Sequence, residues 1–143
     1  MAKRVLVPVD ARARSETVVP LVAALARGGG ASVRLLRVSP VPERVVGPHG
    51  QTIAYADQEM ARLTGEGLDD LRRIEVELDG IPVESVVRFG DPVEEILLEA
   101  EAFDADLIAL STSARGRLGR ALWPGVPERV AAQATVPTLV LHE

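Results

Sequence analysis

The chain lacks cysteine altogether and contains only two histidines in 143 residues. The absence of cysteine excludes disulfides, thiol catalysis, and zinc or iron–sulfur sites that need thiolate ligands. The two histidines, His49 in an expected loop and His142 near the end of the chain, are too few for a His-rich metal site, and we expect surface or structural roles for both. The sequence therefore predicts no metal site and no redox chemistry based on thiols.

Positive charge is also scarce. The formal net charge is −5, and Lys3 is the only lysine. A protein dedicated to nucleic acids needs a basic face that neutralises phosphates, so we expect no nucleic-acid partner. The local exception is a cluster of three arginines, Arg115, Arg117 and Arg120. It is either a solvated loop that aids solubility or part of an anion site, and the composition leaves both interpretations open.

Long apolar runs are missing too. The apolar runs, such as LIAL, are far too short to cross a bilayer, and the N-terminal residues MAKRVLVPVD lack the pattern of a signal peptide. With 47% hydrophobic and 26% charged residues, the composition is that of an ordinary globular protein. We expect one domain over residues 1–143, a cytoplasmic location and no membrane partner.

Along the sequence, segments with the spacing of strands alternate with segments with the spacing of helices. Short apolar segments rich in β-branched residues indicate buried strands, and segments with apolar residues three or four apart indicate helices. Expected strands are residues 4–9, 32–38, 83–89, 107–110 and 137–142; expected helices are residues 15–27, 55–78, 93–103 and 125–134. Residues 39–52, broken by prolines and glycines, are expected to form a long loop.

This order, βαβαβαβαβ, predicts an α/β fold with an open five-stranded parallel sheet and helices on both faces. The first and fourth strands are then neighbours at the point where the strand order reverses, and a crevice opens beyond their carboxyl ends. Asp10 and Ser111 are expected to face each other there. The fourth strand, the loop of residues 111–124 and the following helix start together form the expected anion site, because helix N-termini present unpaired N–H groups.

Several chemistries that such sheets support need residues or motifs that this chain lacks. Asp10 stands alone and no lysine occurs late in the chain, so a phosphoacceptor site of the receiver type is not expected. The residues after the first strand, DARARSE, contain neither G-x-G-x-x-G nor a P-loop. No serine lies in a G-x-S-x-G context. We therefore expect no catalytic activity.

Five segments in this order and spacing carry a resemblance to a known family. They are VLVPVD, the second strand ending at Val38 before a long loop, VRFGDPVEEIL, DADLIALST and RVAAQATVPTLVLHE. Over essentially its whole length the chain resembles the universal stress proteins. The resemblance implies a Rossmann-like parallel sheet in the order 3-2-1-4-5 and a homodimer formed by antiparallel contact of the last strands, here between Val136 and Leu141. An uncovered apolar edge strand fits that role, although a strand blunted by its flanking charges is the alternative.

Many members of this family bind ATP through a loop of the form G-2x-G-9x-G-(S/T). Carried onto this chain, its four marked positions are Ser111, Ala114, Pro124 and Gly125, with Arg115 beside the second. None of the four matches. A register one residue later places Gly125 on the third glycine but Val126 where a hydroxyl is expected.

These departures from the family loop are expected to weaken the contacts with the phosphates of ATP more than the contacts with its adenosine. Pro124 has no N–H, and Gly125 has no hydroxyl. Two lost hydrogen bonds to a charged group at roughly 1.5–3 kcal/mol each lower affinity by a factor on the order of 10² to 10⁴. Val9, Asp10 and Val38 match the family's positions near adenine and ribose, although a capping Asp and two core valines are the simpler interpretation.

The first hypothesis is therefore a homodimeric stress-response module with weak ATP binding or none. The alternatives are a sensor that still binds ATP or AMP, and a purely structural module that acts through its dimer edge.

Overall fold

Apolar strands and amphipathic helices alternate in the structure much as the two periodicities predict. The computed structural model describes residues 3–9, 18–42, 45–112 and 125–142. The elements in chain order are β1 (Arg4–Pro8), α1 (Val18–Gly29), β2 (Ser32–Ser39), β3 (Val45–Val46), β4 (Thr52–Ala54), α2 (Ala56–Glu77), β5 (Val83–Phe89), α3 (Pro92–Phe103), β6 (Leu107–Thr112), α4 (Val126–Gln133) and β7 (Thr138–His142).

The main sheet has five strands in the order β5-β2-β1-β6-β7. All four pairings in this sheet are parallel. If the two short strands β3 and β4 are left out of the count, this is the expected order 3-2-1-4-5, so the predicted fold class is confirmed. The order reverses at β1, which lies between β2 and β6, and this is the switch point at which such sheets bind ligands.

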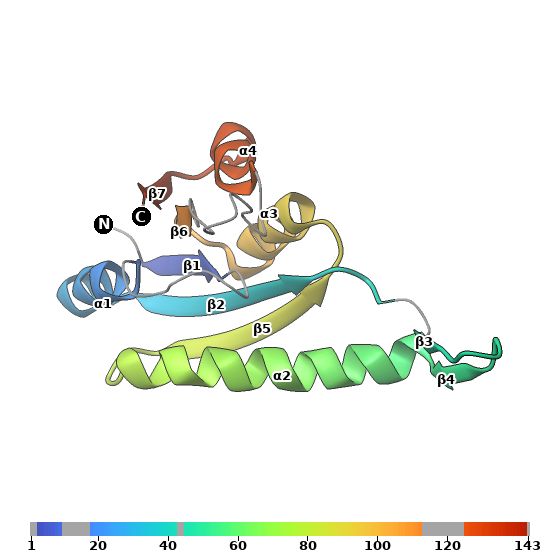
Figure 1. Cartoon of the computed structure of the whole chain (residues 1–143). Helices are drawn as coiled ribbons and strands as arrows, with labels where there is room; N and C mark the ends of the chain where they lie inside the picture. The colour runs from blue at the N-terminus through green and yellow to red at the C-terminus, as the bar shows by residue number, and fades with distance from the viewer. Residues whose placement is uncertain (1–2, 10–17, 43–44, 113–124, 143) are drawn as a thin grey trace.

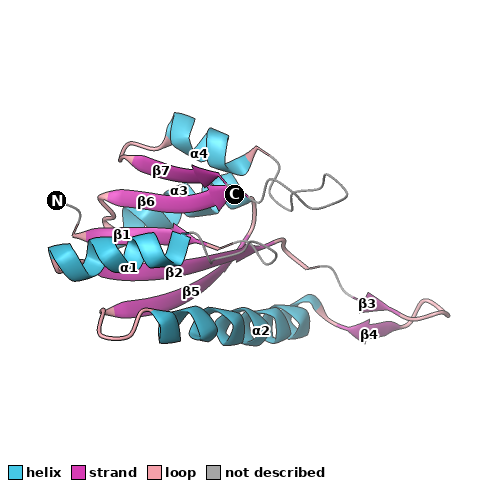
Figure 2. Cartoon of the chain, turned by 60° about the vertical axis from the view of Figure 1, so that its left-hand side comes forward, coloured by secondary structure: helices cyan, strands magenta, loops and turns pink. Residues whose placement is uncertain are grey.

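Two core layers enclose the sheet (Figures 1 and 2). On one face, Val5 and Val7 of β1 and Leu35 of β2 pack with residues of α1 and α2. On the other, Leu6 and Leu36 pack with residues of α3 and α4. Because β1 is buried on both faces, its sequence is a continuous apolar run rather than an alternation.

The region expected as a long loop after β2 contains a two-stranded antiparallel hairpin, β3 and β4. Gly50 takes a φ of 80° in its turn, and the Gly47 N–H donates to the carbonyl of Gln51 at 2.6 Å. Figure 1 shows the hairpin projecting from the body beside the start of α2. The expectation of an unstructured loop was wrong here because strands of two and three residues are too short to show a periodicity.

The remaining boundaries agree within a few residues. β6 continues to Thr112, so Ser111 is a strand residue rather than the first residue of a loop. α2 runs unbroken through Gly65 and Gly67. Within the described residues, no helix is both long enough and apolar enough to cross a bilayer.

Candidate functional site

β1 and β6 pair at their beginnings and separate toward their ends. The ladder between them joins Val5 to Leu107 and Leu6 to Ile108, and no later pair. β1 nevertheless extends to Pro8 and β6 to Thr112. At the opposite edge the carboxylate of Asp106 accepts from the backbone N–H groups of Lys3 and Arg4 at 2.8–3.1 Å, which holds the two strand starts together. The carboxyl ends of the two strands, where the crevice is expected, are therefore not joined by this ladder.

Pro8 explains why the ladder stops. The Val9 N–H donates to the Leu36 carbonyl of β2 at 2.7 Å, so the backbone groups of Val9 point toward β2. Successive residues of a strand direct their backbone groups to alternate sides, and those of Pro8 therefore face β6. Proline has no N–H to donate. Pro8 therefore cannot donate the hydrogen bond that would continue the β1–β6 ladder.

The two valines expected near adenosine are core residues, one directly after β1 and one in β2. Val9 and Val38 are each 5% exposed. Val9 belongs to the layer of α1 and α2, and Val38 to the layer of α3 and α4, so their side chains lie on opposite faces of the sheet. The structure does not bring these side chains together, and any contact with a ligand would come from their backbone. Asp10 lies outside the described residues.

On the β6 side, Ser111 is buried and pairs in register with Leu141 of β7. It is placed one residue before the end of β6, on the strand that borders the crevice. Ala114, Arg115 and Pro124 lie outside the described residues, as do the other two arginines of the loop.

The start of α4 forms the far side of the expected phosphate site. Gly125 caps the helix with φ 74° and ψ −1°, and no side chain caps the first N–H groups. A left-handed conformation favours glycine, so a serine at position 125 would be strained. Val126 is 4% exposed and packs in the α3–α4 layer, so its side chain points away from the crevice. Neither register of the family loop therefore places a hydroxyl at this helix start.

The first turn of α4 has also lost a donor that the sequence reasoning overlooked. Pro127 is the second helical residue and has no N–H. Glu128 adds a carboxylate to the same turn, where its charge interacts favourably with the helix dipole but repels an anion. The N–H groups of Val126 and Glu128 remain, because the next one, that of Arg129, donates to Gly125 O at 3.0 Å. This helix start can hold an anion, but with fewer donors than a regular one.

Pro8 and Pro127 are the two site residues that the sequence reasoning missed. Both could have been found by asking which way the missing N–H would point, since strand alternation and helix position fix that direction. Among the described residues, no group of three or more potential metal ligands comes together. The described residues of the expected site are thus the end of β1 beyond its ladder with β6, Ser111 near the end of β6, and the start of α4, which lacks one N–H donor.

Comparisons with known proteins agree with this architecture. The model of the universal stress protein family matches residues 1–142. The structure of hypothetical protein MJ0577 superposes with a TM-score of 0.78 at 26% identity, covering 99% of this chain and 96% of that one. A search of curated proteins finds no match.

Two further similar structures hold nucleotides. A universal stress protein in complex with cAMP has a TM-score of 0.65 at 19% identity, covering 99% of this chain and 97% of that one. A universal stress protein from Archaeoglobus fulgidus in complex with dAMP has a TM-score of 0.63 at 21% identity, and the match covers 96% of each chain. At these identities the likeness concerns the fold. Taken with the family match over nearly the whole length, the fold and the crevice lead to one conclusion: this chain belongs to the universal stress protein family.

Proposed function

We propose that this protein is a cytoplasmic, homodimeric stress-response module that binds rather than catalyses, and whose crevice holds ATP weakly or not at all. The observation that supports this most is the first turn of α4, with its glycine cap, its proline at the second position and its acidic residue. A triphosphate depends on N–H donors at such a helix start. A crevice that keeps its opening but lacks donors favours the adenosine end of a nucleotide over the phosphate end.

A second candidate follows from the same imbalance. An adenosine monophosphate needs fewer phosphate contacts than ATP, so the missing donors penalise it less. The relatives described with cAMP and dAMP favour this candidate. In this version the protein is a sensor of an adenine nucleotide and uses Asp10, the backbone near Val38 and the arginines of the loop.

Titration of ATP and AMP into the nucleotide-free protein tests both candidates. Trp123, the only tryptophan, lies in sequence beside Pro124 and Gly125, so its fluorescence is a convenient signal. For the weak crevice we expect ATP to bind no more tightly than AMP, with any saturation above about 100 μM. For the sensor we expect AMP to saturate in the micromolar range and Asp10→Ala to abolish the change.

GTP is the matched control, because it carries the same phosphates on another base. A fluorescence change at micromolar ATP that exceeds the response to AMP, and that Asp10→Ala removes, would contradict the weak phosphate hold. Equal responses to ATP and GTP would show that the base is not recognised and would exclude the sensor.

A further inference from the structure

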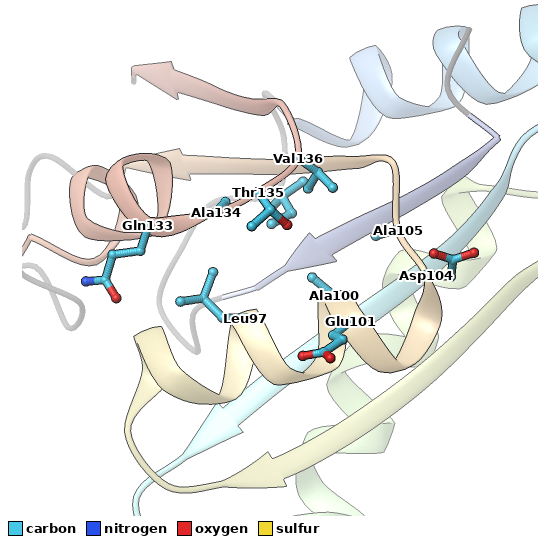
Figure 3. Close-up of a pocket in the computed structure, with 10 residues that line it drawn as sticks. Leu97, Ala100, Glu101, Asp104, Ala105, Gln133, Ala134, Thr135 and Val136 are labelled. Carbon is cyan, nitrogen blue, oxygen red and sulfur yellow. The ribbon is translucent and has the colours of Figure 1, made fainter.

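α3 and α4 enclose a groove away from the crevice. This groove lies on the face of the sheet opposite to the one that α1 and α2 cover. It consists of two adjoining hollows, about 410 Å³ and 380 Å³, which share Leu97, Glu101 and Gln133. Figure 3 shows the larger hollow, with Leu97 and Glu101 rising from α3 on one side and Gln133 to Val136 on the other. Its far end is lined by Asp104 and Ala105, which precede β6. The groove thus reaches the amino edge of the strands, and the nucleotide crevice lies at their carboxyl edge.

Small side chains leave this space open. Ala100, Ala105 and Ala134 line the larger hollow, where larger residues would fill the gap between α3 and the connection from α4 to β7. The rest of the floor is apolar, with Leu97, Ile108 and Val136. Leu98 on the neighbouring surface of α3 is 44% exposed. The groove therefore offers apolar surface that its own chain does not cover within the described residues.

The α3 rim of the groove is acidic. Glu94 and Glu101 are seven residues apart, so they lie on one face of the helix, about 10 Å from each other. Both side chains are exposed, and among the described residues neither carboxylate has a hydrogen bond or an ion pair. Asp104 extends the rim and is 3.6 Å from Arg4, with its side chain 91% exposed. On the α4 side, Arg129 is the only charged lining residue in the part of the chain that the structure describes.

The shape and the charge together select an occupant. Two hollows joined end to end along α3 extend from Asp91 to Asp104, which is about 20 Å at the rise of a helix. A segment of polypeptide fits this length better than a compact small molecule. Apolar side chains would enter the hollows, and basic side chains would pair with the acidic rim.

We propose that the α3–α4 groove is a docking site for a basic amphipathic peptide segment of a partner protein. Such a segment places leucine-like residues against Leu97 and the alanines. It places arginine or lysine residues about two helical turns apart, opposite Glu94 and Glu101. The net charge of −5 attracts such a segment at low ionic strength.

The test uses a fluorescein-labelled synthetic helix of 14 residues that has leucines along one face and arginines flanking them. We expect its anisotropy to saturate with the full-length protein at 50 mM salt, and its affinity to fall at least tenfold at 500 mM salt. A double variant, Glu94→Lys with Glu101→Lys, should bind at least tenfold more weakly. The matched control, Glu77→Lys with Asp79→Lys, changes the net charge equally at the exposed end of α2 and should bind within twofold of wild type.

Two altered peptides separate the electrostatic contribution to binding from the apolar one. A peptide with glutamates in place of the arginines, and one with serines in place of the leucines, should each fail to saturate. Equal weakening by both double variants would overturn the proposal, because nonspecific attraction to an acidic protein would then explain the binding. Binding of the serine peptide as tightly as the leucine peptide would overturn it as well, and so would no binding by wild type. Sedimentation equilibrium of the protein alone gives the remaining outcome: self-association lost in the Glu94→Lys, Glu101→Lys variant would mean that a second copy occupies the groove.

Discussion

At the scale of single residues, two prolines shape the crevice through the N–H group that each lacks. Pro8 ends the hydrogen-bonded ladder between β1 and β6, and Pro127 removes a donor from the start of α4. Under the proposed function, the first leaves the ends of the two strands unpaired for a ligand, whereas the second weakens the hold on the anionic end of that ligand. The same missing N–H would therefore have opposite consequences for binding at the two positions.

Replacing Pro127 with alanine restores one N–H to the first turn of α4. One hydrogen bond to a charged phosphate contributes about 1.5–3 kcal/mol, so we expect ATP affinity to rise at least about tenfold. Calorimetric titration of ATP measures the change. Pro40→Ala, in the exposed segment after β2, is the matched control and should leave the affinity unchanged. If Pro127→Ala binds ATP no better than wild type, its N–H does not face the phosphates.

The buried carboxylate of Glu99 connects α3 to β2 and β5, the two strands at one side of the sheet. Glu99 of α3 is 3% exposed and accepts from Arg34 Nη1 at 2.6 Å and from Arg88 Nη1 at 2.9 Å. Arg34 also pairs with Glu84, and its guanidinium lies 4.3 Å from the centre of the Phe103 ring. The hydrogen bonds that Arg88 donates to Glu95 and Glu99 raise the pKa of Arg88 above its ordinary value. These contacts tie α3 to β2 and β5.

Glu99→Ala should lower the free energy of unfolding by about 3 kcal/mol, because it leaves two partly buried guanidinium groups without a shared acceptor. Glu101→Ala, two residues along the same helix and exposed, should change it by no more than about 0.5 kcal/mol. Urea denaturation followed by circular dichroism measures both. Equal effects of the two substitutions would show that the network adds nothing beyond helix stability.

At the scale of elements, the two glycines of α2 differ in what surrounds them. A Cβ at Gly65 would meet nothing within 4 Å, whereas a Cβ at Gly67 would lie 3.0 Å from Val87 Cγ2 and 3.5 Å from Arg37 Cγ. Gly67 therefore permits the close packing of α2 on β5 and β2. Gly65 has no such reason in its surroundings.

The two glycines should respond oppositely to alanine. Gly65→Ala should raise the free energy of unfolding by about 0.5–1 kcal/mol, because alanine is the better helix former. Gly67→Ala should lower it by about 1 kcal/mol, because a β-branched neighbour in a packed sheet yields little. The urea midpoints of the two variants provide the comparison. A gain in stability for Gly67→Ala would show that Val87 repacks easily.

The length of an element decided whether the sequence could predict it. α2 and β5 are long enough for the spacing of apolar residues to be clear, and their boundaries were predicted within a residue or two. The hairpin was missed because its strands have two and three residues. The end of β6 was placed too early, because serine and threonine at positions 111 and 112 have the composition of a loop.

At the scale of the whole molecule, the sheet order followed from the alternation of strands and helices together with the family resemblance. The switch point between β1 and β6 followed from the same topology, and the crevice expected there stays a prediction. The left-handed cap at Gly125 did not follow from the topology, because it depends on backbone geometry rather than on residue type alone. The placement of Val9 and Val38 in opposite core layers is another fact of strand alternation that the motif comparison overlooked.

The proposed dimer depends on the outer edge of β7. The Ile108 N–H donates to the Pro137 carbonyl, so alternation directs the backbone of Val140 away from β6. Val140→Pro removes an outward donor and should give monomers, whereas Val140→Ala keeps that donor and should remain dimeric. Sedimentation equilibrium distinguishes the two states, and thermal unfolding checks that both variants are folded. A dimer that survives in folded Val140→Pro would place the interface elsewhere.

The central claim is that the crevice is open but holds phosphates poorly, and the affinity of the wild-type protein for ATP tests it most directly. Isothermal titration calorimetry of nucleotide-free protein should give an ATP dissociation constant above about 100 μM and no smaller than that of AMP. A dissociation constant for ATP of a few micromolar, and smaller than that of AMP, would contradict the account.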